Sequence, residues 1–381
     1  MTYHVMLIPT LDCPSNCSYC WGSKKGSGLM DIQVIKDVTK WLENFKDEPV
    51  HFTFHGGEPL IAGYDFYKEA LPLLSQDKGY KNAGFSLQSN LWLIDDEMSE
   101  LFHEYNVAVS TSIDGPKELN DFQRGKGYYD RTMEGYDLLK SHGVNASFIC
   151  TFTSHTINYY EEVFEYFAEN GYTIKLHAAL PSMRGDNADS WAITPKEHGE
   201  LLVKLFDKYL ENLDRISIKD FDHFCKSVLI RRGTLCTLAN CLGSTFAVGY
   251  DGSIYPCYRF NGMPEYIMGN VSDSPSLDDL MDTDAWHKIQ SFNDFVDEDC
   301  KRCKYIKFCR GGCPYNGINS NIDHDANAVD PHCEAYKMIF KDITDRFNKQ
   351  LLAGGLGIPG MLNTKPTQNK KANIMDLMNR L

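Results

Sequence analysis

Cysteines are the residues of this 381-residue chain best suited to chemistry, and most of the thirteen fall into two groups. Cys13, Cys17 and Cys20 stand near the start of the chain. Eight more crowd its last third: Cys236, Cys241, Cys257, Cys300, Cys303, Cys309, Cys313 and Cys333. A chain of this length does not need disulfides to fold, and it carries no export signal. Thiols grouped in this way therefore indicate metal binding in a reducing compartment.

The first group has three and then two residues between its cysteines. This spacing places three thiolates on one tight loop, enough to ligate three irons of a 4Fe–4S cluster. The fourth iron then has no protein ligand nearby, and an open metal position is typical of a catalytic site rather than a structural one. A zinc site is the alternative, but three thiolates without a nearby fourth Cys or His suit it poorly.

Polar residues follow the next three strand-like runs of the chain. They are Gly56-Gly57-Glu58-Pro59, Gln88-Ser89-Asn90, and Ser112-Ile113-Asp114-Gly115-Pro116 with Arg124 shortly after. The glycines allow the backbone to approach a ligand closely, and Glu58 is placed to meet an ammonium group. Arg124 can bind a carboxylate through two of its nitrogens. Each motif is weak alone, but together they predict a binding site at the ends of the strands.

The elements that position these residues alternate along the first two-thirds of the chain. Strand-like runs rich in Val, Ile, Phe and Thr lie at 4–10, 50–55, 84–89, 107–113, 146–153 and 173–179. Amphipathic helical patterns lie at 32–45, 66–74, 96–105, 132–141, 159–170 and 195–213. Six such units predict an α/β fold with parallel strands, an open partial (β/α)6 barrel rather than a closed eight-fold one. Functional groups should lie at the C-terminal ends of its strands.

The composition changes at about Arg215. Asp251-Gly252 separates two short apolar runs and predicts a hairpin. Beyond it we expect a loop-rich region with one closing helix over 331–352, forming a small domain that bound metal stabilises because its own core is small. The predicted domains are 1–220 for the partial barrel, 221–352 for a bridge and the cysteine-rich domain, and 353–381 for a tail. The tail is either a flexible extension or docks its end, 374–381, as a short helix.

The overall composition excludes several classes of protein. With 38 Lys+Arg against 52 Asp+Glu, the net charge of -14 argues against a nucleic-acid partner and against an anionic membrane. Hydrophobic residues make up 43% of the chain, as in folded proteins. The chain has no apolar run of about 18 residues and no signal peptide, so we expect a soluble, cytoplasmic protein.

Cys13-x3-Cys17-x2-Cys20, with Tyr19 before the last cysteine, resembles the signature of the radical SAM enzymes. In that superfamily the open iron binds S-adenosylmethionine, and reduction of the cluster yields a 5′-deoxyadenosyl radical that abstracts hydrogen from a substrate. The resemblance implies that Cys13, Cys17 and Cys20 ligate the cluster. It also implies a set of cofactor-binding residues: Tyr19, Gly56, Gly57, Glu58, Pro59, Gln88, Asn90, Ser112, Asp114 and Arg124.

The later cysteines resemble the SPASM extension of radical SAM enzymes that modify peptides and proteins. That extension holds two auxiliary 4Fe–4S clusters, which makes three clusters in all. The resemblance assigns Cys236, Cys241, Cys257 and Cys313 to auxiliary cluster I, and Cys300, Cys303, Cys309 and Cys333 to auxiliary cluster II. Two zinc ribbons are the alternative that spacing alone leaves open. A multi-cluster electron carrier is the non-enzymatic alternative, but a carrier does not need the Gly56–Pro59 motif or an open iron.

Nearly the whole chain resembles the anaerobic sulfatase-maturating enzymes, which oxidise a Cys or Ser of a sulfatase to formylglycine. In those enzymes an aspartate that acts as base follows the equivalent of Cys257, where this chain has Tyr258. A phenol with a pKa of ~10 is a poor base near neutral pH. His55 also replaces an expected glutamine. The chain is similar as well to archaeal radical SAM proteins, including those of methanogens, that are assigned to peptide modification.

We therefore predict an oxidoreductase that modifies a ribosomal peptide or protein through a thioether, a carbon–carbon crosslink or side-chain oxidation. Formylglycine formation is the alternative. Candidate catalytic residues are Tyr258, Asp222 and Cys225. Of these, Cys225 could donate a hydrogen atom to a substrate radical, as in peptide epimerases, and Asp222 could act with His223 in acid–base catalysis. Solvated or capping roles are open for both Asp222 and His223. His55 and His177 are candidate substrate contacts.

The chain also suggests its partners. The first cysteine is only thirteen residues from the start, so we expect no fused domain for binding a leader peptide. The substrate peptide would bind in the barrel cleft or be delivered by a separate leader-binding protein. An electron donor such as ferredoxin or flavodoxin would reduce the clusters.

Overall fold

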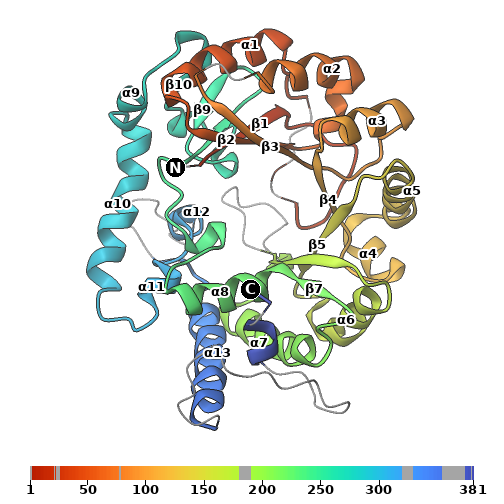
Figure 1. The fold of residues 1–381 in the computed structure, drawn as a ribbon, viewed down its shortest axis with the longest axis vertical. Coiled ribbons are helices and arrows are strands. Elements are labelled where there is room, and N and C mark those ends of the chain that lie inside the picture. Colours follow the sequence, from red (N-terminus) through yellow and green to blue (C-terminus); the bar gives the residue numbers. More distant parts are fainter. Residues whose placement is uncertain are drawn as a thin grey trace. The chain divides into compact units, whose positions relative to one another are not determined.

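The computed structural model describes residues 2–20, 22, 26–76, 79–179, 190–319, 329–353, 374–378 and 380–381. The chain forms two compact units, which are interleaved along the sequence (Figure 1). The first contains Met1–Ile149 and Cys241–Asn293, and the second contains Cys150–Pro181, Ser190–Asn240 and Asp294–Leu381. The domain boundaries expected near residues 220 and 352 stay a prediction.

Within the first unit the sheet has the strand order β10-β9-β8-β1-β2-β3-β4, followed by the first residues of β5. Strands β1 to β5 pair in parallel, β8 pairs in parallel with β1, and β8, β9 and β10 pair antiparallel. The strands are β1 (Tyr3–Thr10), β2 (Pro49–Gly56), β3 (Lys81–Gln88), β4 (Ala108–Ser112), β5 (Ala146–Phe152), β8 (Thr245–Val248), β9 (Ser253–Tyr255) and β10 (Gly269–Asn270). Parallel pairing in chain order confirms the predicted α/β fold of the partial-barrel type.

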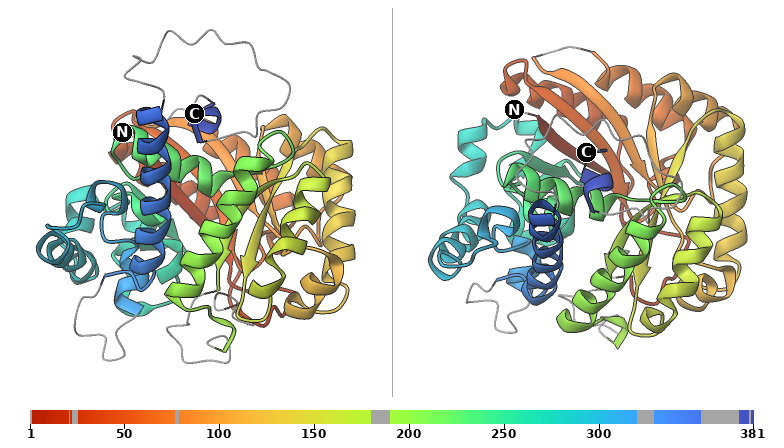
Figure 2. Two further views of the ribbon diagram at one scale, coloured as in Figure 1. Left: turned by 90° about the horizontal axis from the view of Figure 1, so that it is seen from below. Right: turned by 60° about the horizontal axis from the view of Figure 1, so that its bottom comes forward.

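Helices follow the strands of the first unit and lie along one face of its sheet (Figures 1 and 2). They are α1 (Ile32–Trp41), α2 (Gly63–Leu74), α3 (Asp96–Glu104), α4 (Lys117–Arg124) and α5 (Tyr128–Ser141), with α9 (Leu277–Met281) and the start of α10 (Asp284–Asp299) later in the chain. The main core lies between this face and the helices. In it, Phe52 and Phe54 of the sheet pack with Trp41, Tyr67 and Phe102 of the helices.

The opposite face of the same strands carries several polar side chains. Because side chains alternate along a strand, His4, Thr53 and Ser86 point away from the apolar core. The Thr53 hydroxyl lies 2.6 Å from His4 Nε2 and 2.6 Å from the Ser86 hydroxyl. Two residues further along, the same face carries His55 on β2 and Gln88 on β3. A polar face of the sheet thus leads to the strand ends where the site was predicted.

The second unit contains the short parallel pair β6 (Thr173–Ala178) and β7 (Ser217–Ile218). Its helices are α6 (Tyr160–Glu169), α7 (Pro195–Glu211), α8 (Lys219–Ile230), α11 (Ile306–Cys309), α12 (Pro314–Asn319), α13 (Cys333–Ala353) and α14 (Ile374–Met378). Helix α7 begins with a capping box of Thr194 and Glu197. A Cβ on Gly199 would lie 2.5 Å from Met338 Sδ, so glycine at this position lets α7 and α13 pack closely.

The predicted hairpin at Asp251-Gly252 is confirmed by the β8–β9 pair. The prediction of a loop-rich region with one closing helix is wrong, because α9, α10, α11 and α12 also lie there. Helix α10 buries Ala285, Ile289, Phe292 and Val296, whose spacing is helical. Helix α14 buries Ile374, Leu377 and Met378, as expected for a docked end of the tail, while 354–373 lies outside the described residues. None of the described helices is long and apolar enough to span a membrane.

Candidate active site

The first three cysteines lie on the loop that directly follows β1. Cys13 and Cys17 are partly buried, and Cys20 is exposed. The Cys20 amide donates a hydrogen bond to the Cys17 carbonyl at 3.1 Å, and the Ser15 hydroxyl lies 3.2 Å from the Cys17 sulfur. The thiolate charges of all three are close enough to affect one another. The structure therefore brings the predicted ligand set together.

Burial controls the protonation of these thiols. It raises the pKa of Cys13 to about 12 and also raises the pKa of Cys17, although the nearby Arg124 charge acts in the opposite direction. Iron binds the thiolate, so loading a cluster here must release protons.

Ser27 forms hydrogen bonds with the residues at which the cysteine loop begins. Its hydroxyl accepts a hydrogen bond from the Leu11 amide at 2.9 Å and lies 2.9 Å from the Thr10 hydroxyl. Its own amide donates to Asp12 Oδ1 at 3.1 Å. These contacts tie the residues before Cys13 to the segment that returns to α1, and they fix where the loop begins.

Gly56 and Gly57 bring the end of β2 against the base of the loop. The Gly57 amide donates to the Thr10 carbonyl at 3.0 Å, and the Glu58 amide donates to the Asp12 carbonyl at 2.7 Å. A Cβ on Gly56, whose φ is +123°, would lie 2.3 Å from the Thr10 oxygen, and one on Gly57 would lie 2.2 Å from the Asp12 oxygen. The glycines therefore serve a close approach between two protein segments, besides any approach to a ligand.

Glu58 joins the end of β2 to the end of β3. One carboxylate oxygen accepts hydrogen bonds from the Ser89 hydroxyl at 2.8 Å and the Leu60 amide at 2.9 Å. The other accepts from the Asn90 amide at 2.7 Å. Complete burial raises the pKa of Glu58 to about 7, although the three donors favour the charged form. A contact between Glu58 and a cofactor ammonium stays a prediction.

Asp114, just beyond β4, connects the cysteine loop to α4. Its buried carboxylate accepts hydrogen bonds from Arg124 Nε at 2.6 Å, from Arg124 Nη2 at 2.8 Å and from the Tyr19 hydroxyl at 2.9 Å. It also accepts one from the Gln123 amide group. One carboxylate thus fixes the aromatic residue of the cysteine loop and two residues of a helix.

The remaining edge of the Arg124 guanidinium faces the cysteine loop. Arg124 Nη1 lies 3.9 Å from the Cys17 sulfur and 3.3 Å from the Tyr128 hydroxyl. The guanidinium also sits over the Tyr19 ring, 5.4 Å from its centroid. Two of its nitrogens already bind Asp114, so its predicted contact with the cofactor carboxylate stays a prediction.

Gln88, Asn90 and Ser112 complete the set at the ends of β3 and β4. The Gln88 side-chain amide donates to the Ser112 hydroxyl at 3.2 Å. The Asn90 side-chain amide donates to the Cys13 sulfur at 3.7 Å. Sequence reasoning missed Ser27, Gln123 and Tyr128, which are buried or hydrogen-bonded polar residues outside the recognised motifs.

Four of the later cysteines converge within the second unit. Cys300, Cys303, Cys309 and Cys333 are close enough for the Cys333 charge to raise the pKa of both Cys300 and Cys309, after burial as the main cause. Burial and these charges raise the pKa of Cys309 to about 12. Four thiols from one unit fit the ligand set of a 4Fe–4S cluster.

The described residues hold no group of three or more His, Cys, Asp or Glu side chains arranged around a single metal ion. In a 4Fe–4S cluster each thiolate binds a different iron. The cysteines therefore surround the whole cluster and lie farther apart than the ligands of a single ion.

Comparisons with known proteins assign the family. Residues 7–167 match the model of the radical SAM superfamily, and residues 236–304 match SPASM, an iron–sulfur cluster-binding domain. An uncharacterized protein of Methanothermobacter thermautotrophicus is 51% identical over 233 residues, which are 61% of this chain and 89% of that protein. The chain belongs to the radical SAM superfamily. Its predicted resemblance to radical SAM/SPASM proteins is therefore confirmed.

This radical SAM protein is also similar to sulfatase-maturating enzymes. The cysteine-type anaerobic sulfatase-maturating enzyme of Clostridium perfringens is 29% identical over 347 residues, 86% of this chain and 92% of that enzyme. The solved structure of native anSMEcpe with bound AdoMet and the Cp18Cys peptide superposes with a TM-score of 0.81 at 28% identity, covering 93% of this chain and 100% of that one. The expected likeness to this group of enzymes is confirmed as well.

Two residues at which this radical SAM chain was expected to differ from the maturases lie together. The rings of His55, at the end of β2, and Tyr258, directly after Cys257, have centroids 4.3 Å apart and planes inclined by 34°. The Gly56 amide donates to His55 Nδ1 at 2.7 Å, which places the proton of a neutral imidazole on Nε2. The structure thus places His55, a candidate substrate contact, next to Tyr258, a candidate catalytic residue.

The other candidate residues belong to the second unit of this radical SAM protein. Asp222 accepts a hydrogen bond from the Tyr209 hydroxyl at 2.7 Å, and His223 Nδ1 lies 3.0 Å from the Thr234 hydroxyl. Cys225 is fully buried on α8, and burial raises the pKa of its thiol. His177 lies on β6 and is partly buried. The proposed roles of Asp222, Cys225 and His177 stay predictions.

The four cysteines predicted to ligate auxiliary cluster I do not all belong to the same unit of the chain. Cys241 and Cys257 belong to the first unit, while Cys236 and Cys313 belong to the second. Their grouping into one cluster stays a prediction.

Proposed function

We propose that this radical SAM/SPASM protein is an oxidoreductase that modifies a ribosomal peptide or protein by abstracting hydrogen from a side chain or Cα. The products would be a thioether, a carbon–carbon crosslink or an oxidised side chain. The observation that carries this proposal is the loop with three cysteines, which is hydrogen-bonded to the ends of β2 and β4. The chain that contains this loop is similar to a solved structure that holds both AdoMet and a peptide.

The residues of the first unit fit a cluster and its cofactor. Cys13, Cys17 and Cys20 would hold three irons, and the strand ends around them would hold S-adenosylmethionine. When bound, these groups supply a 5′-deoxyadenosyl radical that takes a hydrogen atom from the substrate. Arg124 places a positive charge beside Cys17, and Asp114 holds both Arg124 and Tyr19 in position. The chain's own contribution is to position these groups before the reaction.

His55 and Tyr258 would contact the substrate in this proposal. They form a pair at the end of β2, on the polar face of the sheet, where a maturase is expected to carry a glutamine and an aspartate. The pair offers an N–H donor and a phenol instead of a carboxylate, which suits binding better than proton removal near neutral pH.

The eight later cysteines would hold two auxiliary clusters, which bring the total to three. These clusters would accept an electron as the product forms. An electron donor such as ferredoxin or flavodoxin would supply the reducing electron, and a separate leader-binding protein could deliver the peptide. A cytoplasmic location, which we also propose, would keep the thirteen cysteines reduced.

The proposal is tested on the purified protein reconstituted with iron and sulfide without oxygen. With dithionite and S-adenosylmethionine we expect 5′-deoxyadenosine and methionine as products, measured by liquid chromatography. The variant C17A lacks one of the three proposed ligands, and it should release no 5′-deoxyadenosine. An intact protein with full iron content that forms no 5′-deoxyadenosine would rule out the proposed activity.

Formylglycine formation is the second candidate function, because the chain is 29% identical to a cysteine-type sulfatase-maturating enzyme. Tyr258 weighs against it, since a phenol would replace the expected carboxylate base. Mass spectrometry of a Cys-x-Pro-x-Arg peptide after incubation distinguishes the two. We expect an unchanged mass, whereas conversion of the cysteine to formylglycine would favour the second candidate.

A further inference from the structure

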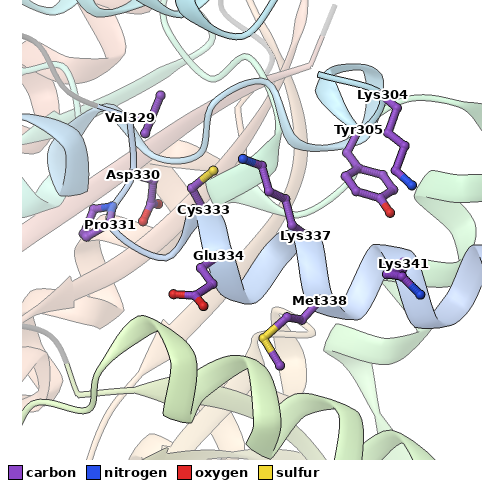
Figure 3. A pocket seen from close by; sticks show the side chains of 10 residues that line it. All are labelled: Lys304, Tyr305, Val329, Asp330, Pro331, Cys333, Glu334, Lys337, Met338 and Lys341. Carbon is purple, nitrogen blue, oxygen red and sulfur yellow. The ribbon is translucent and has the colours of Figure 1, made fainter. Parts of the chain in front are cut away.

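Helix α13 places two lysines on the same side as the first cysteine of the helix. Cys333, Lys337 and Lys341 are four residues apart, the spacing that aligns side chains along a helix. All three line an open hollow of about 620 Å³ in the second unit. Figure 3 shows the amino end of Lys337 directed at the Cys333 sulfur, while that of Lys341 points elsewhere.

Lys337 interacts with three of the four thiols that would hold auxiliary cluster II. Its ammonium group donates a hydrogen bond to the Cys333 sulfur, and the charges of Cys303 and Cys300 attract it. Lys337 thus lies against the ligand set as a hydrogen-bond donor and as a cation.

The other two lysines of the hollow have different partners. Lys341 Nζ donates to Asp345 Oδ2 at 2.7 Å, and the Lys304 ammonium sits over the Tyr305 ring, 4.8 Å from its centroid. Since Lys341 lies one turn beyond Lys337 on the same helix, it is a natural control. A substitution there removes the same charge from the same hollow but leaves the thiols untouched.

We propose that Lys337 is a positioning residue that raises the reduction potential of auxiliary cluster II through its hydrogen bond to the Cys333 sulfur and its charge beside Cys300 and Cys303. The inference rests on the proposed function, because it requires that these cysteines hold a cluster.

The physical reason is the charge of the cluster. A 4Fe–4S cluster with four thiolates is an anion, and each added electron makes it more negative. A cation and an N–H donor at the sulfur stabilise the reduced form more than the oxidised form, which raises the potential. A cluster tuned in this way accepts an electron more readily, as the proposed reaction requires.

The experiment compares wild type with K337M, K337Q, K337R and K341M, all reconstituted in full. Redox titrations followed by electron paramagnetic resonance give the midpoint potential of each cluster, and the signal missing in C333A identifies cluster II. We expect K337M and K337Q to shift this one potential to more negative values. K337R, which keeps charge and donor, and K341M should remain near wild type.

Three results would overturn the role of Lys337. One is an unchanged cluster II potential in a fully loaded K337M or K337Q, and another is an equal shift in K341M. The third is a loss of about four of about twelve irons in K337M, K337Q and K337R alike, which would make Lys337 a packing residue. A wild-type protein without any Cys333-dependent signal would instead contradict the assignment of cluster II, so the two failures are distinguishable.

Discussion

The Asp114 carboxylate joins the cysteine loop to helix α4 in the candidate site. It accepts hydrogen bonds from Tyr19, Gln123 and Arg124, and both Asp114 and Arg124 are buried. A buried charge is costly unless it is paired and hydrogen-bonded, and removing one partner leaves the other uncompensated. The buried charge of Arg124 is therefore compensated by Asp114, and the position of Tyr19 in the cysteine loop depends on both residues.

We expect D114N to destabilise the protein by about 3–5 kcal/mol, because the amide cannot neutralise the buried Arg124. The free energy of unfolding, measured anaerobically with urea, tests this expectation. The matched control is D130N, which removes an exposed carboxylate from an ion pair with Lys117. We expect D130N to unfold like wild type, and equal stability of the two variants would show that the Asp114–Arg124 pair is dispensable.

At the scale of the element, helix α4 shows where sequence patterns stop being informative. Its buried residues Asn120, Gln123 and Arg124 are all polar, so the segment has no apolar periodicity. What holds it is a set of hydrogen bonds to Asp114, a partner outside the helix. By contrast, α1 was predictable from Ile35, Val38 and Trp41, which form one apolar face.

Helix α10 was missed for a different reason. Its apolar residues have helical spacing, but it lies between cysteine-rich segments that we interpreted as loops. At the site, the cysteine loop and the Gly-Gly-Glu-Pro motif were predictable as residues at strand ends. The hydrogen bonds that Glu58 accepts from Ser89 and Asn90, and the pairing of His55 with Tyr258, were not, because they join segments that only the folded chain brings together.

The junction between β2 and the cysteine loop leads to a prediction for G57A. The added Cβ would lie 2.2 Å from the Asp12 oxygen and 2.4 Å from the Leu11 oxygen. Both are backbone atoms, so the base of the loop must shift, at a cost of about 1–3 kcal/mol or more. We expect G57A to lose about four of the irons bound by wild type, measured by iron analysis.

The control for this prediction is G22A, in the same loop. A Cβ on Gly22 would have no atom within 4 Å, so the variant should keep its irons. If G57A also kept its full iron content and formed 5′-deoxyadenosine at the wild-type rate, close approach at Gly57 would not be needed for the cluster.

In the whole molecule, two of the predicted sets of cluster ligands belong to different units. The predicted ligands of the catalytic cluster, Cys13, Cys17 and Cys20, lie within the first unit, and the predicted ligands of auxiliary cluster II lie within the second. In the second unit, Cys333 begins α13, which buries Ala335, Ile339 and Ile343. A cluster on Cys333 would therefore fix the start of a helix on which the core of that unit depends.

This arrangement predicts that a mutation can remove one cluster and leave the other in place. In C333A we expect a loss of about four irons and a lower Tm, because the constraint that joins α13 to Cys300, Cys303 and Cys309 is lost. S-Adenosylmethionine cleavage should remain, since the first unit keeps its own cysteines. Calorimetry, iron analysis and the 5′-deoxyadenosine assay measure the three effects on one preparation.

The reciprocal variant C13A completes the test. It should lose a similar number of irons and all 5′-deoxyadenosine formation, while proteolysis of α13 remains as slow as in wild type. The physical reason is that the ligands of auxiliary cluster II are untouched, so the start of α13 stays fixed. Faster cleavage of α13 in C13A, or full iron content in C333A, would mean that the cysteines do not divide between the units in this way.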